Sequence, residues 1–177
     1  IPAEGKVLRV NLGSGQRKFG TPDCSWLNVD VNPKWEPDLV ADGGDLSLIG
    51  DASAEYVVLH HVLEHFGLGE ADAMLKECYR IMAPGGSLIV CVPDLRVLAK
   101  AWLRGSIEDY IYCVNLYGAY MSDEADRHKW GYSLPSLKKT LDTEATPWKH
   151  VKLFDFRKIE GADIAQDFWI LAMECVK

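Results

Sequence analysis

The sequence predicts a single α/β domain built on a doubly wound, mostly parallel sheet. In the first half, short apolar runs alternate with polar turns, and an amphipathic helix separates two of these runs. Such alternation is typical of parallel strands joined by crossover connections. The 177 residues are enough for one domain with a substantial core, so the expected domain spans residues 1–177.

Four short strands are expected before residue 60. They cover residues 7–12, 26–31, 38–41 and 56–59. Each run is apolar, and it ends at a glycine, an acidic residue or a histidine. In open parallel sheets, ligands bind beyond the carboxyl ends of the strands. The polar residues at these strand ends are therefore expected to form one binding rim.

A helix is expected over residues 70–82, because its apolar residues recur at the spacing of a single helical face. Pro84-Gly85-Gly86 follows and is expected to end the helix, with glycine as its C-cap. Residues 88–92 are continuously apolar, as in a strand that is buried on both faces. Cys78 and Cys91 fall in these apolar patterns and are expected in the core.

The second half is less regular. Residues 95–135 are rich in tyrosine, tryptophan and charge, and we interpret them as a lid or insertion. Tyr110, Val114, Tyr117 and Met121 follow helical spacing, which is more typical of core than of a pocket. The alternative is a lid that packs over the bound ligand. A helix is expected over residues 134–141. Residues 151–156 and 168–176 are expected to be strands that pair antiparallel at the sheet edge.

The turn Gly13-Ser14-Gly15 follows the first strand, and Asp30 ends the second strand 17 residues beyond Gly13. Glycines let the backbone approach a ligand closely, and a carboxylate at the next strand end accepts hydrogen bonds from ribose hydroxyls. Dinucleotide sites usually carry a third glycine at the position of Lys18. Its absence favours an adenosine-containing ligand other than NAD.

His61, Glu64 and His65 form the His-x-x-Glu-His pattern of one class of zinc peptidases. A zinc peptidase needs a sustained helix and a further ligand, whereas Gly67 and Gly69 interrupt any helix here. The sequence therefore predicts no metal site. Glu64 and His65 are interpreted as structural, while His61 is expected to contact cofactor or substrate.

Several segments together resemble the class I S-adenosylmethionine-dependent methyltransferases, and more narrowly their bacterial and phage members. The segments are "VNLGSG", "LNVD", "VAD", "VLHHVLEHF" and "RIMAPGGSLIVCVPD", with "RHKWGYSLPSLKKTL" extending the similarity more weakly. The resemblance implies S-adenosylmethionine as cofactor. It also implies a Rossmann-like, seven-stranded sheet whose antiparallel last strand lies between the fifth and sixth.

The resemblance further implies cofactor contacts at the strand ends, by Leu12, Gly13, Ser14, Gly15, Asp30, Val31, Asp42, Gly43, His60 and His61. The glycine turn would lie under the methionine and ribose parts, and Asp30 would bind the ribose hydroxyls. Val31, Asp42 and Gly43 would meet the adenine, and the two histidines the methionine end. Asn11 departs from the acidic residue of many members, which predicts a weaker contact with the cofactor's ammonium group. Arg17 replaces a further glycine that many members carry.

Candidate acceptor-binding residues follow the fifth strand and lie in the segment "DRHKWGY". They are Asp94, Arg127, Trp130 and Tyr132. Arginine can hold an anionic group, and aromatic rings can cover a sugar, a ring or a cation. His128 is the candidate general base. The alternative is a solvated loop that Trp130 and Tyr132 pin to a minor core.

The net charge of −7 disfavours nucleic acid as a partner, since phosphate backbones require a basic face. Five cysteines without a C-x-x-C pair fit reduced thiols and a cytoplasmic location, and no segment suits a bilayer. The expected function is methyl transfer from S-adenosylmethionine to a small-molecule acceptor such as a sugar, a lipid-linked compound or a natural product. The alternative is a cofactor-binding regulatory module without turnover. The sequence does not indicate the oligomeric state.

Overall fold

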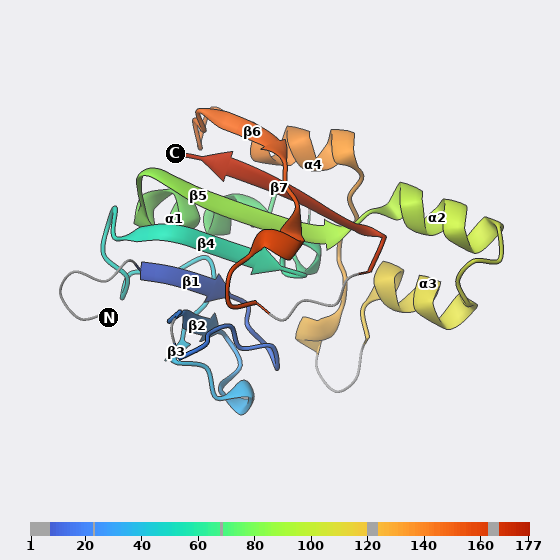
Figure 1. The fold of residues 1–177 in the computed structure, drawn as a ribbon, viewed down its shortest axis with the longest axis horizontal. Helices are drawn as coiled ribbons and strands as arrows, with labels where there is room; N and C mark the ends of the chain where they lie inside the picture. The colour runs from blue at the N-terminus through green and yellow to red at the C-terminus, as the bar shows by residue number, and fades with distance from the viewer. Residues whose placement is uncertain (1–7, 23, 68, 120–123, 163–166) are drawn as a thin grey trace.

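A computed structural model describes residues 8–22, 24–67, 69–119, 124–162 and 167–177. A seven-stranded sheet in the order β3-β2-β1-β4-β5-β7-β6 forms its centre (Figure 1). The strands are β1 Leu8–Leu12, β2 Leu27–Asp30, β3 Leu39–Val40, β4 Ala54–His60, β5 Met82–Pro93, β6 His150–Leu153 and β7 Ile170–Val176. The first five strands pair in parallel, and β7 pairs antiparallel with both β5 and β6. The predicted fold, including the last strand between the fifth and sixth, is confirmed.

Four α-helices lie around the described part of the sheet. They are α1 Ala71–Ile81, α2 Leu95–Leu103, α3 Asp109–Tyr117 and α4 Leu134–Leu141. Short 3-10 helices cover Pro33–Trp35, Leu63–His65, Glu124–Asp126 and Phe156–Lys158. The arrowheads of β4 and β5 point toward the end of the molecule that carries α2 and α3, whereas β7 runs the opposite way (Figure 1). No helix of the described residues is long and apolar enough to cross a membrane.

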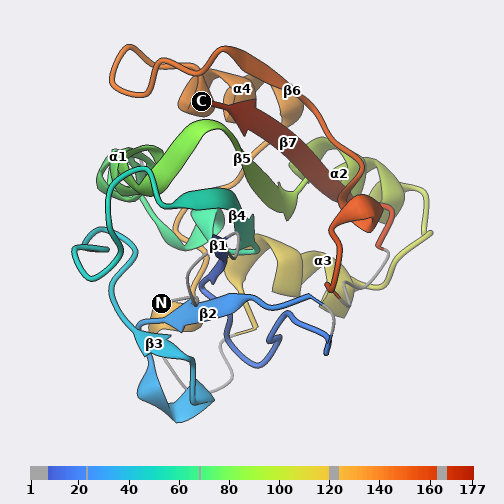
Figure 2. The ribbon, with the colours of Figure 1, turned by 60° about the vertical axis from the view of Figure 1, so that its left-hand side comes forward.

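The core has two parts, one on each face of the sheet. On one face α1 and α4 pack through Met74 and Leu137 against alternate residues of the central strands, such as Leu59 and Val90. On the other face, the intervening residues such as Val58 and Ile89 are covered by Phe19 and Trp26 from loops. The alternation follows from the two-residue period of a strand. Figure 2 shows the sheet in a second view, in which α1 and α4 are labelled.

The end of α1 corrects one sequence prediction. The helix ends at Ile81, and its C-cap is Met82 in an extended conformation rather than a glycine. Pro84 disfavours helical backbone at the residue before it, and β5 begins at Met82. Gly86 instead serves close packing, because a Cβ there would lie 3.0 Å from Ala83 O and 3.1 Å from Glu55 O.

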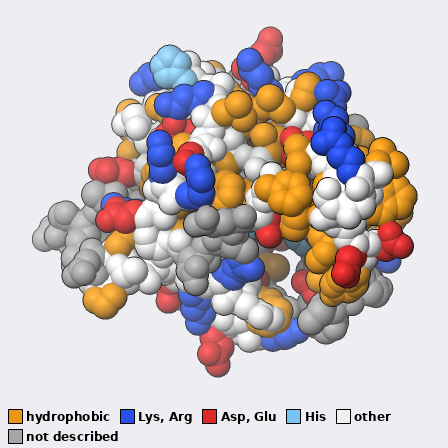
Figure 3. All heavy atoms as spheres, turned by 45° about the vertical axis from the view of Figure 1, so that its right-hand side comes forward, with side chains coloured by type: hydrophobic (Ala, Val, Ile, Leu, Met, Phe, Trp, Pro, Cys, Tyr) orange, Lys and Arg blue, Asp and Glu red, His pale blue; other side chains and the backbone are white. Residues whose placement is uncertain are grey.

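The region from residue 95 to 135 forms α2, α3 and an irregular return to α4. Tyr110 and Tyr117 are 66% and 63% exposed, so the interpretation of their stripe as core is wrong, and Met121 lies outside the described residues. The stripe is misleading because α3 packs on α2, through the stacked rings of Trp102 and Tyr112. Figure 3 shows hydrophobic side chains gathered at this end of the molecule.

Candidate functional site

A cavity of about 840 Å³ opens beyond the carboxyl ends of β1, β2 and β4. Cavities that take small molecules and cofactors commonly have this size. Nine of the ten predicted cofactor residues line it: Leu12, Gly13, Ser14, Gly15, Asp30, Val31, Gly43, His60 and His61. The predicted rim of strand ends is therefore a single site in the folded chain.

The turn after β1 is held in place by the end of β2. Gly13 N and Ser14 N both donate to Val29 O, at 2.8 and 3.0 Å. Gly13 has φ +71°, a left-handed conformation that glycine adopts without strain. A Cβ at Gly13 would also lie 2.5 Å from a methyl of Val62, the second residue after β4. The turn therefore fits against two neighbouring strand ends only because residue 13 is glycine.

Asp30 links the glycine turn to the segment after β2. Its carboxylate accepts from Gly15 N at 2.7 Å through Oδ2 and from Asn32 N at 2.8 Å through Oδ1. An ionised carboxylate offers about four acceptor positions, so two remain for a ligand in the cavity. The same side chain thus shapes the turn and presents negative charge beside it.

The hydrogen bonds of Asn11 explain why this position carries an amide and not an acidic side chain. Its Nδ2 donates to Arg17 O and to Asn28 Oδ1, both at 2.9 Å, and the side chain is buried. Both of these bonds need an amide donor, which a carboxylate lacks. Asn11 therefore stabilises the conformation of the turn after β1.

The substitution Asn11→Asp should lower the free energy of unfolding by about 2–4 kcal/mol, because two buried hydrogen bonds are lost and two acceptors face a carboxylate. Urea denaturation measures this change. The control is Asn32→Asp, since the side-chain oxygen of Asn32 caps the following 3-10 helix by accepting from Lys34 N. Aspartate caps equally well, so this variant should stay within about 0.5 kcal/mol of the original. Equal losses in both variants would contradict the assigned role of Asn11.

Of the three predicted adenine contacts, two line the cavity and one does not. Val31 is 55% exposed and lines the cavity together with Gly43. Asp42 is not among the lining residues, and its Oδ1 accepts from Gly44 N at 2.8 Å within its own turn. A contact of Asp42 with the adenine edge therefore stays a prediction.

His60 and His61 stand at the end of β4, with their rings edge to face at 4.6 Å. Burial, and then the charges of His61 and Arg17, lower the pKa of His60 to about 3, so its ring is neutral. His60 Nε2 is buried without a hydrogen-bond partner among the described residues. His61 has φ +56°, a conformation that non-glycine residues adopt rarely and that is enriched at functional sites.

Glu64 lies behind these histidines in the 3-10 helix Leu63–His65 and is 1% exposed. Its Oε1 is 3.0 Å from His61 Nδ1. Burial raises the pKa of Glu64, but His61 and His128 lower it more, and the net shift is downward. The carboxylate is therefore charged inside the protein.

Residues 124–132, which we name the crossing segment, run across this part of the site. Lys129 N and Trp130 N both donate to Glu64 O, at 2.9 and 3.1 Å, and His128 N donates to Tyr117 O at 3.0 Å. These bonds join the crossing segment to the 3-10 helix after β4 and to the end of α3. His128 thereby lines the cavity, as do Glu124 and Asp126 of the same segment.

Comparisons with known proteins agree with this geometry. Residues 22–90, less than half of the chain, match the family model "Methyltransferase domain". A SAM-dependent methyltransferase from Archaeoglobus fulgidus superposes with a TM-score of 0.62 at 16% identity, over 98% of this chain and 87% of that chain. The chain has the class I methyltransferase fold.

Two further solved structures share this methyltransferase fold. One, from Methanosarcina mazei, has a TM-score of 0.58 at 14% identity over 99% of this chain and 94% of that one. The other, a possible histamine N-methyltransferase from Thermotoga maritima, has a TM-score of 0.59 at 14% identity over 97% and 83%. No curated protein matches the sequence. At these identities the neighbours establish the fold and not the acceptor.

Within this methyltransferase fold, the four predicted acceptor residues lie outside the cavity lining. Asp94 accepts from Arg96 N and Val97 N as the N-cap of α2. Tyr132 is 3% exposed, and Trp130 and Arg127 are exposed. Acceptor contacts by these residues stay predictions, and the core interpretation of Tyr132 agrees with its burial.

Other residues of the cavity wall escaped the sequence analysis. They are apolar or amide-bearing side chains from distant elements, including Trp35, Phe66, Met74, Val114, Asn115 and Ile170. His65, interpreted as structural, does bond backbone through Nδ1 to Arg127 O at 3.2 Å, but it also lines the cavity. The sequence offered a signal only for Phe66 and His65, since both lie in "VLHHVLEHF", one of the segments that carry the resemblance.

Proposed function

We propose that the chain transfers the methyl group of S-adenosylmethionine to a small-molecule acceptor. The observation that carries this proposal is the cavity in which the glycine turn, Asp30 and the two histidines at the end of β4 meet. The family match and the fold support the class of cofactor. The bacterial and phage subgroup and a cytoplasmic location stay predictions.

The cavity fits the proposed cofactor chemically. Ser14 Oγ and His60 Nε2 are buried polar atoms without hydrogen-bond partners among the described residues, and both residues line the cavity. Unsatisfied buried polar atoms destabilise a protein unless a ligand or water completes them. Asp30 supplies acceptors suited to ribose hydroxyls, while Val31 and Met74 supply apolar surface for a base. Nothing in this set requires a pyrophosphate.

When bound, the cofactor supplies an activated methyl group on a sulfonium, so the protein's own task is positioning. The turn at Gly13 and the carboxylate of Asp30 would hold the nucleoside end, and α3 and the crossing segment would exclude water. Burial lowers the pKa of His128, which leaves its ring neutral and able to take a proton from an acceptor. The net charge of −7 favours a small molecule over nucleic acid.

A regulatory module that binds the cofactor without turnover remains the second candidate. The described residues of the cavity wall include no cysteine, and their one lysine, Lys129, forms an ion pair with Glu70 at 3.1 Å. The lack of an evident nucleophile favours this candidate. Methyl transfer does not require such a group, because the acceptor is itself the nucleophile. Turnover therefore decides between the two candidates.

Calorimetry with S-adenosylmethionine, S-adenosylhomocysteine and NAD tests the cofactor. We expect binding of both sulfur compounds and none of NAD, and failure of both sulfur compounds to bind would refute both candidates. A labelled-methyl assay against a metabolite extract then tests turnover. A labelled product supports the enzyme, whereas binding without any product across broad extracts supports the module.

Asp30→Ala should weaken S-adenosylhomocysteine binding about 10- to 150-fold, which corresponds to roughly 1.5–3 kcal/mol for charged hydrogen bonds to ribose. The control is Asp45→Ala. Asp45 also accepts from a backbone N–H two residues on, at 3.1 Å, but it lies outside the cavity lining. Calorimetry should find its affinity unchanged. An unaltered dissociation constant for Asp30→Ala would rule out its ribose contact.

A further inference from the structure

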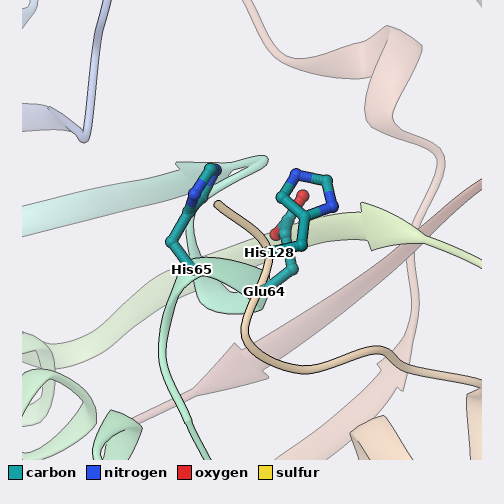
Figure 4. A group of neighbouring side chains, drawn as sticks. All are labelled: Glu64, His65 and His128. Atoms are coloured by element: carbon teal, nitrogen blue, oxygen red, sulfur yellow. The ribbon is translucent and has the colours of Figure 1, made fainter. Parts of the chain in front are cut away.

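Three side chains with metal-binding atoms lie close together at one side of the cavity, and two of them line it. Glu64 and His65 come from the 3-10 helix after β4, and His128 comes from the crossing segment, more than sixty residues later (Figure 4). One ligand atom from each residue lies within 4.8 Å of the other two. The rings of His65 and His128 meet edge to face at 4.8 Å. His65 and His128 also line the cavity.

The hydrogen bonds of the two histidines determine which ring nitrogens are free. His65 Nδ1 lies 3.2 Å from Arg127 O, and His128 Nδ1 lies 3.0 Å from Asn115 O. A carbonyl oxygen only accepts, so each Nδ1 carries the proton. In the form of each ring that binds metals, Nε2 then keeps its lone pair. Histidines that bind metals are held in this way, with the second nitrogen donating to a backbone carbonyl or a carboxylate.

Glu64 adds a charged acceptor to the two nitrogens. Both of its carboxylate oxygens are buried, and neither has a hydrogen-bond partner among the described residues. His61 Nδ1 lies 3.0 Å from Oε1, an ion-pair distance without an aligned hydrogen bond. A buried carboxylate is costly unless a cation compensates it. The site thus gathers three acceptors, and His61 Nδ1 lies beside one of the two carboxylate oxygens.

We propose that Glu64, His65 and His128 bind a divalent first-row transition-metal ion. Two imidazoles and one carboxylate suit Zn²⁺, Co²⁺ or Fe²⁺ better than Mg²⁺ or Ca²⁺, which prefer oxygen ligands throughout. Ligand atoms about 2.1 Å from a tetrahedral metal are about 3.4 Å apart. The spacing of up to 4.8 Å must therefore close by about 1.4 Å, which side-chain rotation can provide.

Three protein ligands leave at least one coordination position for a water or an oxygen of the acceptor. Because His65 and His128 line the cavity, this position faces the proposed cofactor site. The acceptor class that fits is an oxygen compound able to coordinate a metal, such as one with neighbouring hydroxyl or carboxylate groups. This acceptor class rests on the proposed function, whereas metal binding itself does not. With a metal on its Nε2, His128 is a ligand and no longer the general base.

Cobalt(II) titration of the untagged, chelator-treated protein tests the site directly. Visible absorption reports ligand-field bands when Co²⁺ enters a site of nitrogen and oxygen ligands, and Zn²⁺ should displace them. We expect one equivalent to bind. At a 100-fold excess over Kd, a metal that binds only the folded state should raise the Tm by about 5–10 °C.

Glu64→Gln, His65→Gln and His128→Gln should each weaken Co²⁺ binding by at least about 100-fold, because even outer-shell partners contribute 10- to 100-fold. The matched control is His150→Gln, an exposed histidine at the start of β6. It should leave the titration unchanged. Glu64→Gln should also lose the rise in Tm that the metal gives the original protein.

Two results would overturn the proposal. One is the absence of ligand-field bands at millimolar Co²⁺, which would assign compensation of Glu64 to His61 alone. The other is equal Co²⁺ binding by the original protein and His128→Gln, which would place the ion elsewhere. Calorimetry with S-adenosylhomocysteine is run in parallel. Cofactor binding without metal binding refutes only the metal site, and metal binding without cofactor binding refutes only the proposed function.

Discussion

Gly118→Ala should lower the free energy of unfolding by about 3–5 kcal/mol and displace His128 from the cavity. Gly118 is the C-cap of α3, with φ 89° and ψ 162°, a backbone region that is essentially restricted to glycine and costs other residues about 1–3 kcal/mol. A Cβ there would overlap Asp126 O and lie 3.0 Å from His128 N. Overpacking against rigid backbone adds about 1–3 kcal/mol. Urea denaturation measures the loss of stability.

The matched control for this variant is Gly105→Ala, in the turn between α2 and α3. Gly105 also has a positive φ of 67°, but a Cβ there would meet nothing within 4 Å. Only the backbone strain remains, so the expected loss is about 1 kcal/mol. Calorimetry with S-adenosylhomocysteine separates the two further, since only Gly118→Ala moves the crossing segment. Equal effects of the two variants would show that this segment does not depend on Gly118.

The strand ends were predictable because their signals are local. A glycine turn directly after an apolar run and Asp30 at the end of the next run need no knowledge of distant contacts. Parallel strands then bring their carboxyl ends to one edge of the sheet. Nine predicted cofactor residues consequently meet in the cavity. Asp42 follows the same local pattern, yet its turn directs the carboxylate to Gly44 N instead.

The other wall of the cavity was not predictable in this way. His128 reaches the site through backbone bonds of the crossing segment to Glu64 O and Tyr117 O, which join residues about 11 to 66 positions apart. No periodic pattern in the sequence predicts these hydrogen bonds between distant residues. The His-x-x-Glu-His pattern likewise gives no sign that Glu64 and His65 meet His128, which comes from a segment that only the fold brings near.

Gly13→Ala should lower the free energy of unfolding by about 3 kcal/mol and weaken S-adenosylhomocysteine binding at least 10-fold. The left-handed backbone at φ +71° costs an alanine about 1–2 kcal/mol. Contact of the new Cβ with Val62, at 2.5 Å, adds a further 1–2 kcal/mol of overpacking. Because Val62 adjoins His61, relief of this contact would disturb both sides of the cavity at once. Urea denaturation and calorimetry measure the two effects.

A double-mutant cycle separates the contact from the backbone strain. Val62→Ala alone removes two buried methyl groups and should cost about 1–2 kcal/mol. In Gly13→Ala/Val62→Ala the new methyl occupies the vacated space, so the double variant should lose about 1–2 kcal/mol less than the sum of the single losses. Gly15→Ala, with φ +49° and nothing within 4 Å of its Cβ, should show the strain alone, about 1 kcal/mol. Strict additivity of Gly13→Ala and Val62→Ala would mean that the turn after β1 does not pack against the end of β4. The two strand ends would then not support the cavity through this contact.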